Sequence, residues 1–178
     1  YMPPEWHIKE RTFIEWPARK TIWRIGIEHA KKAYANVANA ISEFEKVTMI
    51  VNKGEKTEAS KLLNSEIELL EIQHNDSWFR DNGPTFVYNN NSLSAVCWTF
   101  NCWGEKFHPY DEDAKVAQTL LEHLEINYFK TDLIMEGGSF HTNGKNTLLT
   151  TQECLLNPNR NKNLKQEEIE RRLSKYLG

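Results

Sequence analysis

Two segments of this 178-residue sequence place a carboxylate beside residues that turn the chain. In residues 75–85, two acids, an arginine and a tryptophan fall within six positions, and Asp81 is followed by Asn-Gly-Pro. A rigid turn of this kind could hold the Asp81 carboxylate at the rim of a pocket. The spacing also leaves open a surface turn, in which Asp81 pairs with Arg80 or accepts hydrogen bonds from the turn backbone.

The second segment runs from Met135 to His141 and contains Glu136 followed by two glycines. Glycines let the backbone pass close to another group or to a ligand, and Glu136 stands at the entry of an expected strand. The alternative is a glycine bulge with an exposed glutamate. If Asp81 and Glu136 converge on one cleft, they would bind a planar cation between them.

The cysteines and histidines give weaker signals. The three cysteines form no CxxC pair, and the six histidines form no HExxH or HxH motif, so we expect no metal and no other cofactor. Cys154 stands beside two leucines and is expected to be buried and inert. A cysteine hydrolase that uses Cys102 or Cys154 with His108 or His141 stays open as an alternative.

The composition limits the classes of partner. The net charge is −3, with 39% hydrophobic and 26% charged residues, which is ordinary for a globular protein. Neither a nucleic-acid partner nor a membrane is expected, because the chain has no excess of basic residues and no apolar run of about 18 residues. Sparse, unpaired cysteines indicate a cytoplasmic location.

Helical and strand patterns alternate along the chain, which predicts an α/β or α+β fold. Hairpins interrupt the alternation, so a doubly wound sheet is not expected. Strands are expected at 13–16, 47–51, 67–72, 84–88, 94–100, 126–129, 139–142 and 146–151, and helices at 21–44, 56–63, 112–124 and 163–177.

Several local signals sharpen these boundaries. The helix at 21–44 is expected to bury one apolar stripe, made of Ile22, Ile25, Ala30, Ala33, Tyr34, Val37, Ala38, Ile41 and Phe44. Asp111 or Asp113 could cap the helix at 112–124, and Asn163 with Gln166 is spaced like a capping box. Hairpin turns are expected at 89–91 and at Asn143-Gly144.

Five segments are informative as a set: Pro4-Glu5-Trp6 to Trp23-Arg24; Asn75-Asp76-Ser77-Trp78 with Arg80-Asp81 and Gly83-Pro84-Thr85-Phe86; Phe100-Asn101 with Trp103-Gly104; Glu136-Gly137-Gly138-Ser139; and Leu148-Leu149-Thr150-Thr151 to Asn161. With these residues, in this order, the chain resembles the agmatine deiminase and bacterial peptidylarginine deiminase family. The likeness extends over nearly the whole chain.

The resemblance implies a pentein fold, an αβ-propeller of about five ββαβ units around the active site. Members of the family are about twice as long as this chain, so residues 1–178 would be the N-terminal half of a single domain. The catalytic cysteine and histidine would lie in the C-terminal half. We therefore expect the chain alone to be inactive, and its open sheet edges to favour self-association, for example as a homodimer.

The resemblance also implies the chemistry and the site. A thiolate attacks the carbon of a guanidinium, ammonia leaves, and water releases the ureido product. Asp81 would bind the guanidinium nitrogens, Trp78 would wall the pocket, and Glu136 would hold and charge the catalytic histidine. The expected reaction converts agmatine to N-carbamoylputrescine and ammonia, in putrescine biosynthesis. Peptidylarginine or free arginine as substrate, and a binding module for cationic amines without catalysis, are the alternatives.

Overall fold

The computed structural model describes residues 1–90 and 92–178, which form a mixed α/β structure of two compact units. Unit 1 comprises Tyr1–His7, Arg80–Pro109 and Ala114–Gly178, and unit 2 comprises Ile8–Phe79 and Tyr110–Asp113. The described strands form two sheets of three strands and one sheet of two strands. The expectation of strands, helices and hairpins in one chain is confirmed at this level.

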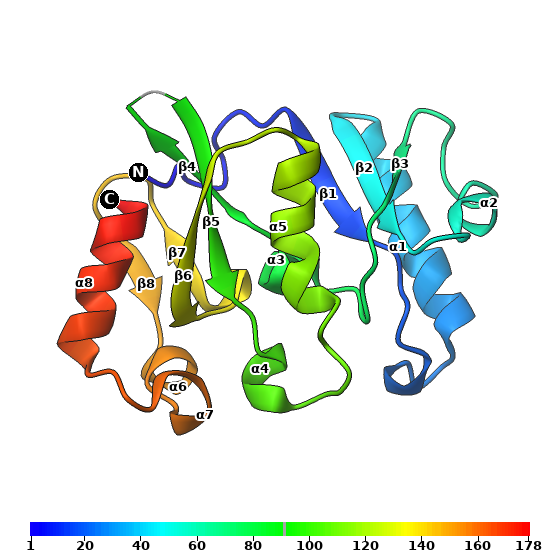
Figure 1. Ribbon diagram of the computed structural model, residues 1–178. Helices are drawn as coiled ribbons and strands as arrows, with labels where there is room; N and C mark the ends of the chain where they lie inside the picture. The colour runs from blue at the N-terminus through cyan, green and yellow to red at the C-terminus, as the bar shows by residue number, and fades with distance from the viewer. Residues whose placement is uncertain (91) are drawn as a thin grey trace. The chain divides into compact units, whose positions relative to one another are not determined.

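Unit 2 is built on a parallel sheet with the strand order β1-β2-β3. Its elements are β1 (Arg11–Glu15), α1 (Ile27–Ser42), β2 (Lys46–Val51), α2 (Lys56–Ala59) and β3 (Glu68–Glu71). The central strand β2 is almost wholly buried, as a strand covered on both faces must be. Helix α1 runs alongside this sheet (Figure 1) and contributes small residues to its core.

The expected helix at 21–44 is wrong at its start. Lys20–Ile22 forms a single 3-10 turn (η1), and α1 begins only at Ile27. The reason is Gly26, whose φ of +90° lies outside the helical region and resets the chain direction. Helix α2 likewise ends at Ala59, short of the expected Leu63.

The expected apolar stripe of this helix is also partly wrong. Ile25, Val37 and Phe44 are 74%, 55% and 87% exposed. Ala30 and Ala38 of the expected stripe are buried, and Lys31 and Ala35, which were not expected, share the buried face of α1 with them. Small side chains let the helix approach the sheet closely, and the buried Lys31 ammonium pairs with Glu58 at 2.7 Å.

Unit 1 contains a strand-strand-helix-strand unit. The hairpin of β4 (Thr85–Asn89) and β5 (Ser92–Thr99) is antiparallel, and α5 (Asp113–His123) leads to β6 (Tyr128–Ile134), which pairs with β5 in parallel. The hairpin is confirmed, although Asn91 of its expected turn lies outside the described residues. Strand β6 begins at Tyr128 and extends beyond the expected 126–129 to Ile134, because the polar residues 130–132 in its middle interrupt the apolar signal.

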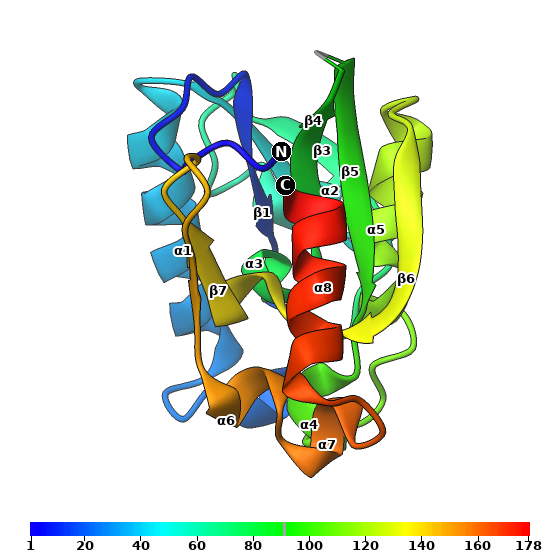
Figure 2. The same ribbon diagram turned by 90° about the vertical axis from the view of Figure 1, so that its left-hand side faces the viewer.

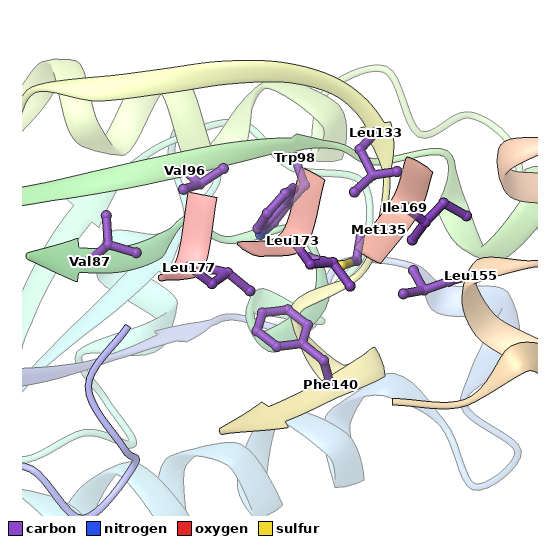
Figure 3. Packing of buried hydrophobic residues seen from close by; sticks show 10 residues of the cluster. All are labelled: Val87, Val96, Trp98, Leu133, Met135, Phe140, Leu155, Ile169, Leu173 and Leu177. Carbon is purple, nitrogen blue, oxygen red and sulfur yellow. The ribbon is translucent and has the colours of Figure 1, made fainter. Parts of the chain in front are cut away.

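The two faces of β5 are covered by different helices. Val96 and Trp98 face the largest cluster of unit 1, which includes residues of α8 (Gln166–Leu177), whereas Ala95 and Cys97 pack against α5. This alternation follows from the two-residue period of a strand. Figure 1 shows α5 and α8 on opposite sides of β5, and Figure 3 shows α8 side chains pointing toward Trp98.

The remaining elements of the chain are short. They are α3 (Phe79–Asn82), α4 (Cys102–Glu105), the 3-10 turn η2 (Gly137–Ser139), β7 (Phe140–Thr142), β8 (Leu148–Thr150), α6 (Gln152–Leu155) and α7 (Pro158–Asn161). The β7–β8 hairpin at Asn143-Gly144 is confirmed. The chain ends lie close together in unit 1 (Figure 2), where the Met2 amide donates to the Leu177 carbonyl at 2.8 Å.

The capping prediction for α8 needs correction. Helix α8 has Lys165 at its N-cap with no side-chain bond, so Asn163 and Gln166 do not form a capping box. The Asp113 carboxylate is used elsewhere, since its Oδ1 accepts from the backbone amides of Asn75 and Asp76 at 2.7 and 3.1 Å. Among the described helices, none has the length and apolar character needed to cross a membrane.

Candidate functional site

Asp81 lies in the short helix α3 and is held from both sides of its carboxylate. Its Oδ1 accepts from the Gly138 amide at 3.0 Å, and its Oδ2 accepts from the Trp103 indole Nε1 at 3.3 Å. Arg80 points elsewhere: its Nε donates to the Gly137 carbonyl at 3.1 Å, and its guanidinium pairs with Glu5. The simple surface turn, with Asp81 paired to Arg80, is therefore not what the structure contains.

Burial raises the pKa of Asp81 above its usual value. The hydrogen bonds from Gly138 and Trp103 and the charge of Arg80 lower it again, but only in part. Two neutral N–H donors thus orient the carboxylate, and none of the described side chains that bond to it is a cation.

Glu136 is buried at 3% exposure, so the alternative of an exposed glutamate on a bulge is wrong. Its Oε1 accepts from Arg160 Nε at 2.6 Å. Burial raises the pKa of Glu136, the Arg160 charge lowers it, and the negative charge of Asp81 raises it again. The two acids therefore interact electrostatically within unit 1.

The diglycine explains how the two acids come together. A Cβ atom at Gly137 would collide with the Arg80 carbonyl oxygen, and one at Gly138 would collide with the Asp81 carboxylate. Only glycine allows this close approach. The prediction that the backbone passes close to another group at Gly137-Gly138 is confirmed, and the group is the Arg80-Asp81 segment.

Trp78 belongs to unit 2, and its contacts within that unit are as follows. Its ring stacks on Trp23 with a centroid distance of 6.0 Å and an interplanar angle of 22°, and 39% of the residue is exposed. Tyr34 of α1 meets Trp23 edge-on at 5.9 Å and donates its hydroxyl to the Ser77 carbonyl at 3.2 Å. An exposed indole face with support behind it is suited to contact a flat cation.

Trp103 and Arg160 are the direct partners of the two acids, and neither was singled out for a role in the site. Arg160 stands in an asparagine- and proline-rich stretch whose crowding was a usable signal. Trp103 gave no such signal, because its contact with Asp81 spans 22 positions and depends on an unusual backbone turn.

The whole chain, residues 1–178, matches the description "Porphyromonas-type peptidyl-arginine deiminase". The chain belongs to this family.

Relatives and solved structures agree with the assignment. A Legionella pneumophila protein provisionally named agmatine deiminase is 46% identical over 181 residues, covering 100% of this chain and 52% of that protein. A Pseudomonas aeruginosa agmatine deiminase is 43% identical over 184 residues, covering 99% and 50%. The structure of Enterococcus faecalis agmatine deiminase matches with a TM-score of 0.95 at 40% identity, again covering 99% and 50%. The chain thus spans about half the length of these relatives.

The cysteines of this deiminase-family chain are poorly placed for attack on a substrate. Burial raises the pKa of Cys97 to about 11, so its thiol is protonated at neutral pH. Cys102 is fully buried, whereas Cys154, which was expected to be buried, is only partly so and packs against the core cluster of unit 1. Among the described residues, no group of three or more His, Cys, Asp or Glu is arranged to hold a metal ion.

Two hollows of unit 1 lie away from the acids of this family member. One, of about 490 Å³, borders the first turn of α8, and the other, of about 190 Å³, lies beside β5 and α5. Neither is lined by Asp81 or Glu136. The expected shared cleft therefore stays a prediction, although the two acids do lie in one unit.

Proposed function

We propose that the full-length protein containing this chain is a guanidine deiminase that converts agmatine to N-carbamoylputrescine and ammonia. The observation that carries the proposal is the pair of carboxylates, Asp81 and Glu136, joined across Gly137-Gly138 and held by defined donors. The names of the relatives at 40–46% identity favour agmatine over peptidylarginine or free arginine.

Asp81 is proposed as the residue that binds the substrate. A guanidinium stays cationic at all physiological pH values and presents N–H groups in a planar fork that fits a carboxylate. The oxygens of Asp81 each accept one hydrogen bond from the protein, and a carboxylate oxygen can accept two. Capacity for two bonds from a guanidinium therefore remains.

Trp78 and Glu136 complete the proposed roles. The Trp78 face would attract the cation by about 0.5–2 kcal/mol. Glu136 would hold the catalytic histidine and favour its charged form, using the carboxylate oxygen that Arg160 does not occupy. In the proposed reaction a thiolate attacks the guanidinium carbon and ammonia leaves. Water then cleaves the thiouronium and regenerates the thiol.

The larger architecture is proposed in the same way. The β4-β5-α5-β6 unit has the ββαβ order of a propeller blade, and residues 1–178 would supply about half of a propeller of five such units. The C-terminal half would supply the nucleophilic cysteine and the histidine. A cytoplasmic location and a homodimer belong to the same proposal.

Ammonia release by the purified full-length protein tests the proposed function. Agmatine, free arginine and a peptide containing arginine would be compared at equal concentrations. We expect agmatine to give the highest kcat/KM and N-carbamoylputrescine as the product. Saturable agmatine binding without ammonia would support the binding module instead, and turnover of the peptide alone would favour the peptidylarginine alternative.

A further inference from the structure

The turn at α4 has an unusual backbone. Cys102, Trp103, Gly104 and Glu105 have φ values of +52°, +55°, +87° and +61°, so four consecutive residues are left-handed and three of them are not glycine. Residues with side chains seldom adopt this region, and runs of them are rarer still. Such strain persists only where the surroundings hold it, and it is concentrated at functional sites.

Asn101 holds the turn in this conformation. Its side-chain Oδ1 accepts from the Gly104 amide at 2.9 Å, and its Nδ2 donates to the Asn159 carbonyl of α7 at 2.9 Å. Cys102, the first residue of the turn, is fully buried. The turn is therefore fixed to the chain on one side and to α7 on the other.

One end of the turn reaches Asp81. The Trp103 indole donates to Asp81 Oδ2 at 3.3 Å, and its ring is held edge-on by Phe100 at 5.4 Å and by Phe107 at 6.1 Å. An indole N–H is a donor without charge. It can fix the direction of the carboxylate and leave its negative charge available for a cation.

The other end of the turn reaches Glu136 through α7. A Cβ atom at Gly104 would collide with the side chains of Asn159 and Arg160, so the turn lies directly against both. The Arg160 guanidinium donates to Asn159 Oδ1 at 2.8 Å through one nitrogen and to Glu136 Oε1 at 2.6 Å through another. The close packing of Gly104 against Arg160 thus restricts the guanidinium that binds Glu136.

We propose that the left-handed turn Cys102–Glu105 is a positioning element that holds Asp81 through Trp103 and Glu136 through Arg160. The contacts form a closed ring, from Asp81 through Gly138 and Glu136 to Arg160, and back through the turn. This inference rests on the proposed function, because the two acids need a fixed geometry if Asp81 binds the substrate and Glu136 holds the catalytic histidine. A turn with a purely structural role would have no reason to contact both Asp81 and the arginine that binds Glu136.

Substitution of Trp103 by phenylalanine tests whether the turn holds Asp81. Trp103→Phe keeps an aromatic ring but removes the donor to Asp81, whose other charged neighbours, Arg80 and Glu136, stay in place. In the full-length protein we expect kcat/KM for agmatine to fall about tenfold at neutral pH. We also expect the acid limb of the pH profile of kcat/KM to move to higher pH, because loss of the hydrogen bond from Trp103 makes Asp81 harder to ionise.

Trp98 provides the matched control for this substitution. Its indole donates to Thr85 Oγ1 at 2.8 Å inside the core of unit 1, and not to either acid. Trp98→Phe should lower the melting temperature without moving the acid limb. If Trp103→Phe changes only the melting temperature, as Trp98→Phe does, the turn is structural and the inference is overturned.

Substitution of Gly104 by alanine tests whether the turn holds Glu136 through Arg160. Gly104 and Gly54 share a φ of +87°, but nothing lies within 4 Å of a Cβ at Gly54. Gly54→Ala therefore introduces only the backbone cost, whereas Gly104→Ala adds the collision with Asn159 and Arg160. We expect kcat/KM to fall with Gly104→Ala and to stay at the parent value with Gly54→Ala. Equal losses of kcat/KM in the two variants would contradict the proposal that the turn holds Glu136 through Arg160.

The variant Asp81→Asn separates failure of this inference from failure of the proposed function. If Asp81→Asn has parental turnover of agmatine, the proposed binding role is wrong and the inference falls with it. If Asp81→Asn loses turnover while Trp103→Phe retains the parental KM and pH profile, only the inference is wrong. Loss in both, with the shifted acid limb in Trp103→Phe, supports the positioning role.

Discussion

Glu136 is buried and Asp81 half-buried in unit 1, and the partners of these two acids differ in charge. Asp81 accepts from a backbone amide and an indole, whereas Glu136 is paired with the Arg160 guanidinium. A paired guanidinium compensates the charge of its carboxylate, and a neutral donor does not. Asp81 is therefore the better candidate to bind an incoming cation, and Glu136 is better suited to orient a neighbouring group.

At the residue scale, the affinity for agmatine should depend on pH. The pKa of Asp81 is raised, first by burial, and a guanidinium binds the ionised form of this carboxylate. Agmatine affinity should therefore be full well above this raised pKa and fall as the pH drops through it. Calorimetric titration of the full-length protein from pH 8 downwards would measure it.

Glu168 supplies the control for this pH dependence. It is a glutamate of α8 whose pKa is lowered to about 2, first by hydrogen bonds from Arg171 and Arg172, so it stays ionised throughout the titration. Glu168→Gln should leave the profile unchanged. An agmatine affinity that does not vary with pH would contradict the assignment of the Asp81 carboxylate as the binding group.

The sequence allowed part of the site to be predicted at this scale. Asp81 and Glu136 could be found because chain-turning residues surround them. The approach of the diglycine to Asp81 followed from the absence of side chains at Gly137 and Gly138. The Trp103 contact could not be found, since three residues with side chains adopt a left-handed turn that their types do not signal.

At the scale of elements, a buried ion pair joins loops of unit 2. Arg19 Nε donates to Asp76 Oδ2 at 3.0 Å, and both side chains are nearly inaccessible. Replacing Arg19 by leucine would leave Asp76 buried without its ionic partner, at a cost of about 3–5 kcal/mol in the free energy of unfolding. Urea denaturation of the parent and variant proteins would measure the difference.

The loss caused by Arg19→Leu should depend on pH. The pKa of Asp76 is already raised, first by burial, and removal of Arg19 would raise it further. When the pKa of a carboxyl group is raised in the folded state, the protein loses stability as the pH rises through that value. The variant should therefore be closest to the parent in acid and furthest from it at alkaline pH. The exposed pair of Arg171 with Glu168 offers a control, and Arg171→Leu should have no measurable effect.

The packing of α8 gives a second prediction at this scale. Leu173 is 7% exposed and lies in the core cluster with Trp98 and Met135 (Figure 3). Leu173→Ala should destabilise the protein by about 2–5 kcal/mol, because it removes buried methyl groups and leaves a cavity. Leu149 is 71% exposed, and Leu149→Ala should be neutral in the same thermal denaturation assay. Equal effects of the two substitutions would contradict the placement of α8.

Most elements could be predicted from the sequence, but the start of α1 and the cap of α8 could not. Apolar residues at helical spacing continue on both sides of Gly26, so periodicity alone does not mark the break. Alanines and Lys31 face the sheet because of close packing and the ion pair with Glu58, and both depend on tertiary contacts that a helical pattern does not contain.

At the scale of the whole molecule, open edges and exposed apolar groups favour self-association. Strand β6 lies at the edge of its sheet, and Phe44 and Val37 are largely exposed on or near α1. We expect the isolated 178-residue chain to elute from size-exclusion chromatography at an apparent mass above 20.9 kDa. A monodisperse monomer by light scattering, unchanged on concentration, would contradict this prediction.

The measurement that bears most directly on the central claim is agmatine turnover by the full-length protein with Asp81→Asn. Asparagine keeps the shape of the side chain and removes its charge, so kcat/KM should fall by at least about thirtyfold. Asp132 is an exposed aspartate paired with Arg172, and Asp132→Asn should leave the rate unchanged. Parental kcat/KM in Asp81→Asn would show that this carboxylate does not bind the guanidinium.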